Sequence, residues 1–192
     1  MLIKIAPLAA AALLAAPAAF AATYKTDQGH TEVFFSWSHV GVSVQSGEFT
    51  SVDGTLELDP ENPEAAALNV TIRTDSLSTG FGPLDDDLSS ANFLEVETYP
   101  EITFVSTGVE RTGENTANVS GDLTIHGVTQ PVVLETTLTH LGAHPAGSVF
   151  EYFQGDWAAF EATTTLDHLS FGVGGFSVGP INVRIVTELK AQ

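Results

Sequence analysis

Apolar and polar side chains alternate with a period of two through most of this chain of 192 residues. In one run Val33, Phe35 and Trp37 take every second position, while Phe34 falls on the polar face with Ser36. Successive side chains of a β-strand point to opposite faces, so this alternation indicates strands with one buried and one exposed face. The pattern recurs at 68–72, 119–125, 132–138, 160–166 and 181–189. An antiparallel all-β fold is therefore predicted.

Glycine and proline interrupt these runs at hairpin spacing, as at Ser46-Gly47, Asp53-Gly54 and Thr112-Gly113, which indicates about eight strands. Two segments, 76–92 and 167–171, break the alternation and predict short helices over the openings of a barrel. One-sided strands can pack as a sandwich or close on themselves, and closure also removes exposed edges. We predict an extended eight-stranded barrel, whose interior is either filled by side chains or holds one ligand.

The amino terminus has the three parts of an export signal. Lys4 supplies a positive charge, residues 5–16 form an apolar run, and Ala19-Phe20-Ala21 supplies a cleavage site. The run has about a dozen residues, whereas a membrane-spanning helix needs about 20. We therefore predict a signal peptide at 1–21, cleaved after Ala21, and one soluble exported domain at 22–192. The chain has no cysteine, which excludes disulfides and a lipidated cysteine after the signal.

The chain is strongly acidic, with a formal net charge of −18 at pH 7. It has 24 aspartates and glutamates against six lysines and arginines, and one of these six, Lys4, belongs to the predicted signal. A surface of this kind repels polyanions, so nucleic acid and anionic membrane surfaces are not expected as partners.

No catalytic or metal-binding motif stands out. His140 and His144 have a spacing that suits a metal on a helix, but neighbouring glycine and proline place them in a predicted loop without a third ligand. The run 85–87 lacks the alternating oxygen ligands and the glycine of a calcium loop. No Gly-x-Ser-x-Gly elbow and no dinucleotide-binding loop are present. An enzyme is therefore not expected.

Several motifs fall in an order that resembles the YceI-like polyisoprenoid-binding family over essentially the whole predicted domain. They are His30, Val33, Phe35, Trp37, His39 and Gly41; then 47–49 and Gly54; then 76–80, Asp86, Leu88, Phe93, Tyr99-Pro100, Phe104 and 106–107; then 121–129 with Pro131-Val132; and finally Asp167, Phe171-Gly172 and the strand from Val178-Gly179. The resemblance implies a lipocalin-like barrel in the periplasm whose lumen takes up an isoprenoid lipid lengthwise.

Two departures from the family pattern bear on the lipid. The family commonly has an arginine before the position of Asp86 and another after that of Asp167, but this chain has Asp85 and His168. A phosphate or pyrophosphate head group is normally bound by arginine or lysine. We therefore expect a lipid with a neutral head, such as a quinone or an isoprenoid alcohol.

The residues expected to contact lipid in the lumen are Phe35, Trp37, Phe49, Phe104, Leu123, Phe160 and Phe171. Each of them could instead simply fill a core. The residues expected at a polar mouth, or in structural roles, are His30, His39, Asp86, His126, Asp167 and His168.

We expect a carrier with no cofactor besides the lipid, and the sequence leaves a homodimer open. Two alternatives remain. An enzyme acting on an isoprenoid lipid would need His30, His39, His126 and Asp86 to converge near the lipid head. A filled barrel acting as an interaction module would have a packed interior and an exposed apolar patch.

Overall fold

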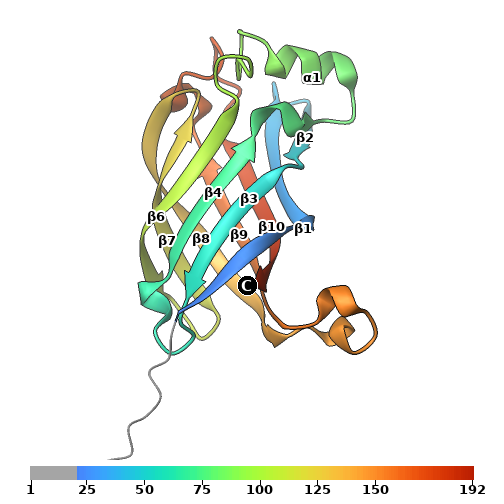
Figure 1. Cartoon of the computed structure of the whole chain (residues 1–192). Helices are drawn as coiled ribbons and strands as arrows, with labels where there is room; N and C mark the ends of the chain where they lie inside the picture. Colours follow the sequence, from blue (N-terminus) through green and yellow to red (C-terminus); the bar gives the residue numbers. More distant parts are fainter. Residues whose placement is uncertain (1–20) are drawn as a thin grey trace, which may run out of the picture.

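The computed structural model describes residues 21–192 as one closed antiparallel β-barrel with a single α-helix (Figure 1). The closed ring follows the order β1–β3–β4–β6–β7–β8–β9–β10, and β10 pairs with β1. The strands of the ring are β1 (Ala22–His39), β3 (Val52–Leu58), β4 (Ala67–Arg73), β6 (Glu101–Arg111), β7 (Thr116–Ile125), β8 (Val128–Ala143), β9 (Asp156–Leu166) and β10 (Ile181–Ala191). The eight-stranded barrel predicted from the alternation is confirmed. The predicted signal peptide falls outside the described residues, except for Ala21.

Strand β1 is long because it pairs with different strands along its two halves. Residues 22–25 pair with β3, and residues 33–39 pair with β2 (Ser43–Phe49), which in turn pairs with β5 (Leu77–Ser78). The register of β1 against β10 shifts between Thr26 and Thr31. A β-bulge of this kind bends a strand and increases its twist, which lets one strand follow the curved wall.

The helical elements are shorter than the sequence predicted. Helix α1 (Gly82–Ser89) occupies only the middle of the segment 76–92, because residues 77–78 join the sheet as β5 and Pro83 favours a helix start. In the second segment a 3-10 helix, η5 (His168–Phe171), begins where the side chain of Asp167 accepts a hydrogen bond from the amide of Leu169 at 3.1 Å. None of the helices in residues 21–192 is long and apolar enough to cross a membrane.

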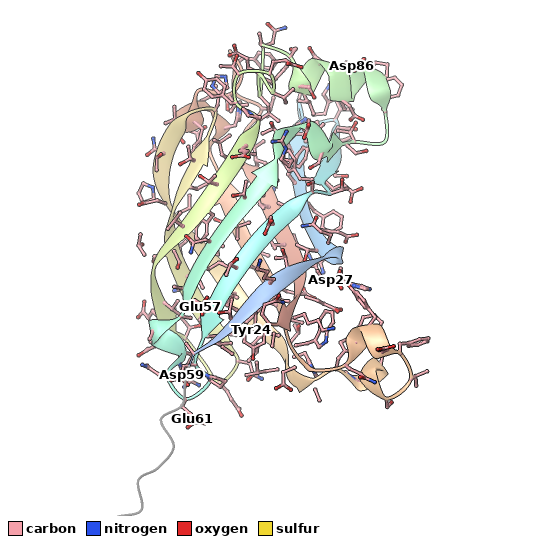
Figure 2. All side chains as sticks on the ribbon, in the orientation of Figure 1. Tyr24, Asp27, Glu57, Asp59, Glu61 and Asp86 are labelled. Carbon is pink, nitrogen blue, oxygen red and sulfur yellow. The ribbon has the colours of Figure 1, made fainter. Side chains whose placement is uncertain are left out.

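The barrel has two differently built ends (Figure 1). The upper end carries α1, the β7–β8 turn and η5, while the lower end carries the β3–β4 connection with η1 (Pro63–Ala65) and the β6–β7 turn. In Figure 2 the label of Asp86 lies at the upper end, and the labels of Asp59 and Glu61 lie at the lower end.

A lobe projects from the wall between β8 and β9 (Figure 1). It contains two short 3-10 helices, η3 (Pro145–Ser148) and η4 (Glu151–Phe153). Phe153 packs against Trp157, His144 and Tyr152, with ring centroids 5.6, 4.4 and 5.1 Å apart. The sequence predicted only a turn here, because an aromatic cluster formed by a loop has no periodicity.

Candidate functional site

The lumen of the barrel contains a cavity of about 360 Å³. All eight strands of the ring contribute lining residues, and most of these side chains are aliphatic or aromatic. The volume lies within the range of roughly 300–1,000 Å³ that is usual for small-molecule pockets. The interior is therefore a candidate ligand site rather than a completely filled core.

Five of the seven residues expected in the lumen line this cavity. They are Phe35, Phe49, Phe104, Leu123 and Phe160. The other two are buried, but they are not part of the lining. Contact of these residues with a ligand stays a prediction.

Trp37 and Phe171 are not part of the lining and pack against different parts of the structure. The ring of Trp37 stacks on Phe35, with centroids 5.9 Å apart and planes at 14°. Phe171, on η5, is only 2% exposed and packs into the main core cluster. Leu88, Leu94 and Val173 pack against the same cluster and fill the upper end with apolar side chains.

Two lining aromatic rings lie close to glycines of neighbouring strands. A Cβ added to Gly47 would lie 2.5 Å from Cζ of Phe35, and one added to Gly121 would lie 2.3 Å from Cζ of Phe104. Both contacts are shorter than any real Cβ tolerates, so only glycine permits these positions. The two glycines therefore leave room for the tips of these rings beside the neighbouring strands.

Several threonine hydroxyls also line the cavity, but they have partners within the wall. The hydroxyls of Thr31 and Thr187 are hydrogen-bonded to each other at 2.9 Å. Thr26 donates to the carbonyl of Val52 at 3.2 Å, and Thr136 donates to the carbonyl of Leu134 at 3.2 Å. Because each of these hydroxyls already has a hydrogen-bond partner, it does not require a polar ligand beside it.

Charged and amide side chains enter the lining only at the lower end. Arg111, Glu114 and Asn115, at the β6–β7 turn, line the cavity and are exposed to solvent. Pro60, from the β3–β4 connection, is likewise exposed and lines the cavity. The lower end is thus the mouth of the cavity. Sequence reasoning recognised the turn at Thr112-Gly113, but the pattern does not show which turn borders an opening.

None of the six polar candidates lines the cavity. His39 and Asp86 are exposed, at the end of β1 and on α1. Asp167 caps η5, so its observed role is structural. His126 packs against Tyr99, with ring centroids 4.3 Å apart, and its Nε2 lies 3.4 Å from the carboxylate of Glu95.

His168 is 9% exposed, and its ring is hydrogen-bonded to the segment that follows η5. Its Nδ1 lies 2.6 Å from the carbonyl of Val173, and its Nε2 accepts a hydrogen bond from the amide of Val178 at 3.3 Å. Both ring nitrogens are therefore occupied by backbone partners. His168 therefore holds the loop rather than a ligand.

His30 lies on the flank of the barrel beside the lobe. Its Nδ1 is 3.0 Å from the carboxylate of Asp27, and its ring centroid is 5.7 Å from that of Phe153. The hydrogen bond to Asp27 raises the pKa of His30, although burial acts against this. Burial opposes ionisation of Asp27, but hydrogen bonds from His30, the amide of Gly29 and Tyr152 outweigh it and lower the pKa of Asp27.

The structure does not bring together the groups that an enzyme acting on the lipid head would need. His30 is on the flank beside the lobe, whereas His126 is in the β7–β8 turn at the upper end. His140 and His144 have ring centroids 6.2 Å apart, and His144 stacks on Phe153. Within residues 21–192 no group of three or more metal-ligating side chains is close enough to hold an ion.

A second hollow of about 610 Å³ lies on the outer surface. It is bordered by outward-facing residues of β8, β9, β10 and β1, including Phe34, Glu135 and Arg184. The guanidinium of Arg184 is paired with Glu161 at 3.2 Å. This groove is open to solvent, so the lumen is the better candidate for an apolar ligand.

The comparisons with known proteins agree with this architecture. The model of the YceI-like domain matches residues 24–191. The chain belongs to the YceI-like family. A UPF0312 protein of Pseudomonas putida strain W619 is 44% identical over 166 residues, which cover 85% of this YceI-like chain and 83% of the relative. A UPF0312 protein of Pseudomonas syringae pv. syringae is 44% identical over 183 residues, which cover 94% and 91%.

Solved structures share the fold of this YceI-like chain at low sequence identity. BcnA of Burkholderia cenocepacia superimposes with a TM-score of 0.71 at 23% identity, covering 87% of this chain and 99% of BcnA. A polyisoprenoid binding domain from Saccharophagus degradans gives a TM-score of 0.65 at 14% identity, covering 90% and 99%. The family and the fold expected from the sequence motifs are confirmed.

Proposed function

We propose that this protein binds an isoprenoid lipid with an uncharged head in the barrel lumen and carries it through the periplasm. The observation that supports this most directly is an apolar cavity packed shut at one end and bordered by exposed polar residues at the other. The export signal predicted at 1–21 supports the location. The polyisoprenoid binding domain from Saccharophagus degradans, which has a similar fold, supports the class of ligand.

The dimensions of the lumen suit a linear chain. Along β6 the lining runs from Ile102 to Arg111. At about 3.3 Å per residue and a strand tilt of roughly 40°, this corresponds to about 23 Å along the barrel axis. A carbon chain with bonds of about 1.5 Å could place about four isoprene units in that length.

Burial of the chain supplies the affinity in this proposal. Apolar carbon contributes about 0.8 kcal/mol per CH₂, so ten buried carbons give about 8 kcal/mol before ordering costs. That free energy corresponds to dissociation constants of micromolar order. No charged anchor is needed to hold the tail.

The charges at the lower end support a neutral head. Among residues 21–192, Arg111 is the only lysine or arginine in the lining, and the carboxylate residue Glu114 lines the same mouth. Asp59 and Glu61 lie at this end as well (Figure 2). These carboxylates would repel a pyrophosphate. Only one guanidinium is available to bind it, whereas bidentate binding of its phosphates is favoured by several.

The test is native mass spectrometry of protein purified from the periplasm, followed by lipid extraction. A matched pair of variants gives the control: Ala162→Phe places a ring in the lumen, whereas Thr163→Phe places one on the exposed outer face of the same strand. We expect a neutral isoprenoid lipid at near-equal stoichiometry in the wild type and in Thr163→Phe, and its loss in Ala162→Phe. Protein free of lipid would contradict binding, and a prenyl pyrophosphate as the main species would contradict the neutral head.

A further inference from the structure

The structure leads us to infer an orientation for the bound lipid and the residues that bind its head. We propose that the head lies at the lower end, where Arg111 and the side-chain amide of Asn115 donate hydrogen bonds to a carbonyl or hydroxyl oxygen, while the tail points towards Phe171. This inference rests on the proposed lipid binding. It assigns a binding role to the β6–β7 turn.

Arg111 differs from the other two arginines in lacking an acidic partner. Arg73 lies 3.3 Å from Asp75 and 3.6 Å from Glu101, and Arg184 lies 3.2 Å from Glu161. Among the described residues, Arg111 makes no ion pair, and one of its Nη2 donors reaches the backbone carbonyl of Glu114 at 3.2 Å. A guanidinium has five N–H donors, so most of those at the cavity mouth are free to bind a ligand.

Backbone hydrogen bonds fix the turn that carries these donors. The amides of Thr112 and Gly113 both donate to the carbonyl of Thr116, at 2.9 and 3.2 Å. The amide of Leu138, on β8, donates to the carbonyl of Asn115 at 2.8 Å. The backbone of Asn115 is thereby held against the neighbouring strand, which reduces the entropy lost when its side chain binds a ligand.

In the part of the chain that the structure describes, the upper end contributes no charged or amide side chain to the lining of the cavity. Phe171, Leu88 and Leu94 pack there. Both ring nitrogens of His168 are occupied, and the hydroxyl of Thr74 donates to the carbonyl of Tyr99 at 2.8 Å. A head group inserted at this end would be desolvated among these apolar side chains, so the tail is placed there.

The experiment compares two probes on lipid-stripped protein: geranylgeraniol and the tetraprenyl hydrocarbon that lacks its hydroxyl. Displacement of a fluorescent apolar dye reports the affinity of each probe. We expect Arg111→Ala and Asn115→Ala each to weaken geranylgeraniol binding about five-fold, as the loss of one net hydrogen bond predicts, and to leave hydrocarbon binding unchanged. Arg73→Ala removes an exposed arginine at the upper end of β4 and should change neither affinity.

The outcomes separate this inference from the proposed function. Equal weakening for both probes would show that Arg111 and Asn115 only cover apolar chain at the mouth, which overturns head-group binding. Unchanged affinity for geranylgeraniol would overturn it as well. If neither probe binds the wild type, lipid binding itself fails. Urea denaturation midpoints equal to that of the wild type would establish that the variants are folded.

Discussion

The two ends of the barrel differ in what their side chains do. At the upper end, buried apolar residues such as Phe171 and Leu77 complete the main core, and buried polar groups such as His168 and Thr74 have partners. At the lower end, exposed residues including Arg111 and Glu114 border the cavity. The packing of the upper end mainly stabilises the fold. The lower end leaves the cavity open, and the opening costs little stability.

This difference follows from the connections between strands. At the lower end the β6–β7 turn is short, and the long β8–β9 connection, residues 144–155, projects from the barrel as the lobe and contributes no residue to the lining of the cavity. At the upper end, residues 74–100 and 167–180 form long connections that include α1 and η5, and these connections supply the side chains that fill the barrel. The barrel therefore has a single mouth because the long connections of the upper end pack into the core, whereas the long connection of the lower end does not.

The largest expected effect comes from breaking the packing of the upper end with Phe171→Ala. Removing a ring that is 2% exposed leaves a cavity and should lower the free energy of unfolding by about 3–5 kcal/mol. Urea denaturation measures this loss. Phe176→Ala, in the nearby loop, removes a ring that is 61% exposed and should change stability by no more than about 0.5 kcal/mol. Similar losses for both variants would refute the assigned role of Phe171.

A smaller effect distinguishes two threonines, one at each end. Thr74→Val at the upper end removes a buried donor to the carbonyl of Tyr99, and we expect a loss of about 1–2 kcal/mol. Thr112→Val at the lower end removes an exposed hydroxyl that lies 2.9 Å from that of Thr116, and should cost no more than about 0.5 kcal/mol. Urea denaturation of both variants at one pH compares them. Equal losses would show that the lower end is as tightly built as the upper.

The sequence predicted the wall of the barrel better than its ends. Alternation identifies inward positions such as Phe104 and Phe160, because a strand has only two faces. The same alternation does not show how far the cavity extends along the barrel. Phe171, which is expected in the lumen, fills the upper end instead. Arg111 was missed as a mouth residue, because a charged side chain beside a turn normally indicates only exposed surface.

The smallest expected effect is a pH dependence on the flank between the ends, where His30 meets Asp27. A histidine whose folded pKa is raised contributes stability below its unfolded pKa of about 6.5, and this contribution disappears as pH rises through the folded pKa. The lowered pKa of Asp27 adds stability above its unfolded value of about 3.9, which is lost as pH falls through the folded value. Both contributions are therefore present between about pH 4 and pH 6.5.

Because the side chain of His30 is 45% exposed, solvent screening limits the effect to less than about 1 kcal/mol. Urea denaturation at pH 5.5 and pH 8.5 should show a greater loss of stability with rising pH in the wild type than in His30→Gln. His39→Gln, at the exposed end of the same strand, should behave as the wild type. If His30→Gln keeps the full pH dependence, the contact between His30 and Asp27 is not its cause, and another titrating group is responsible.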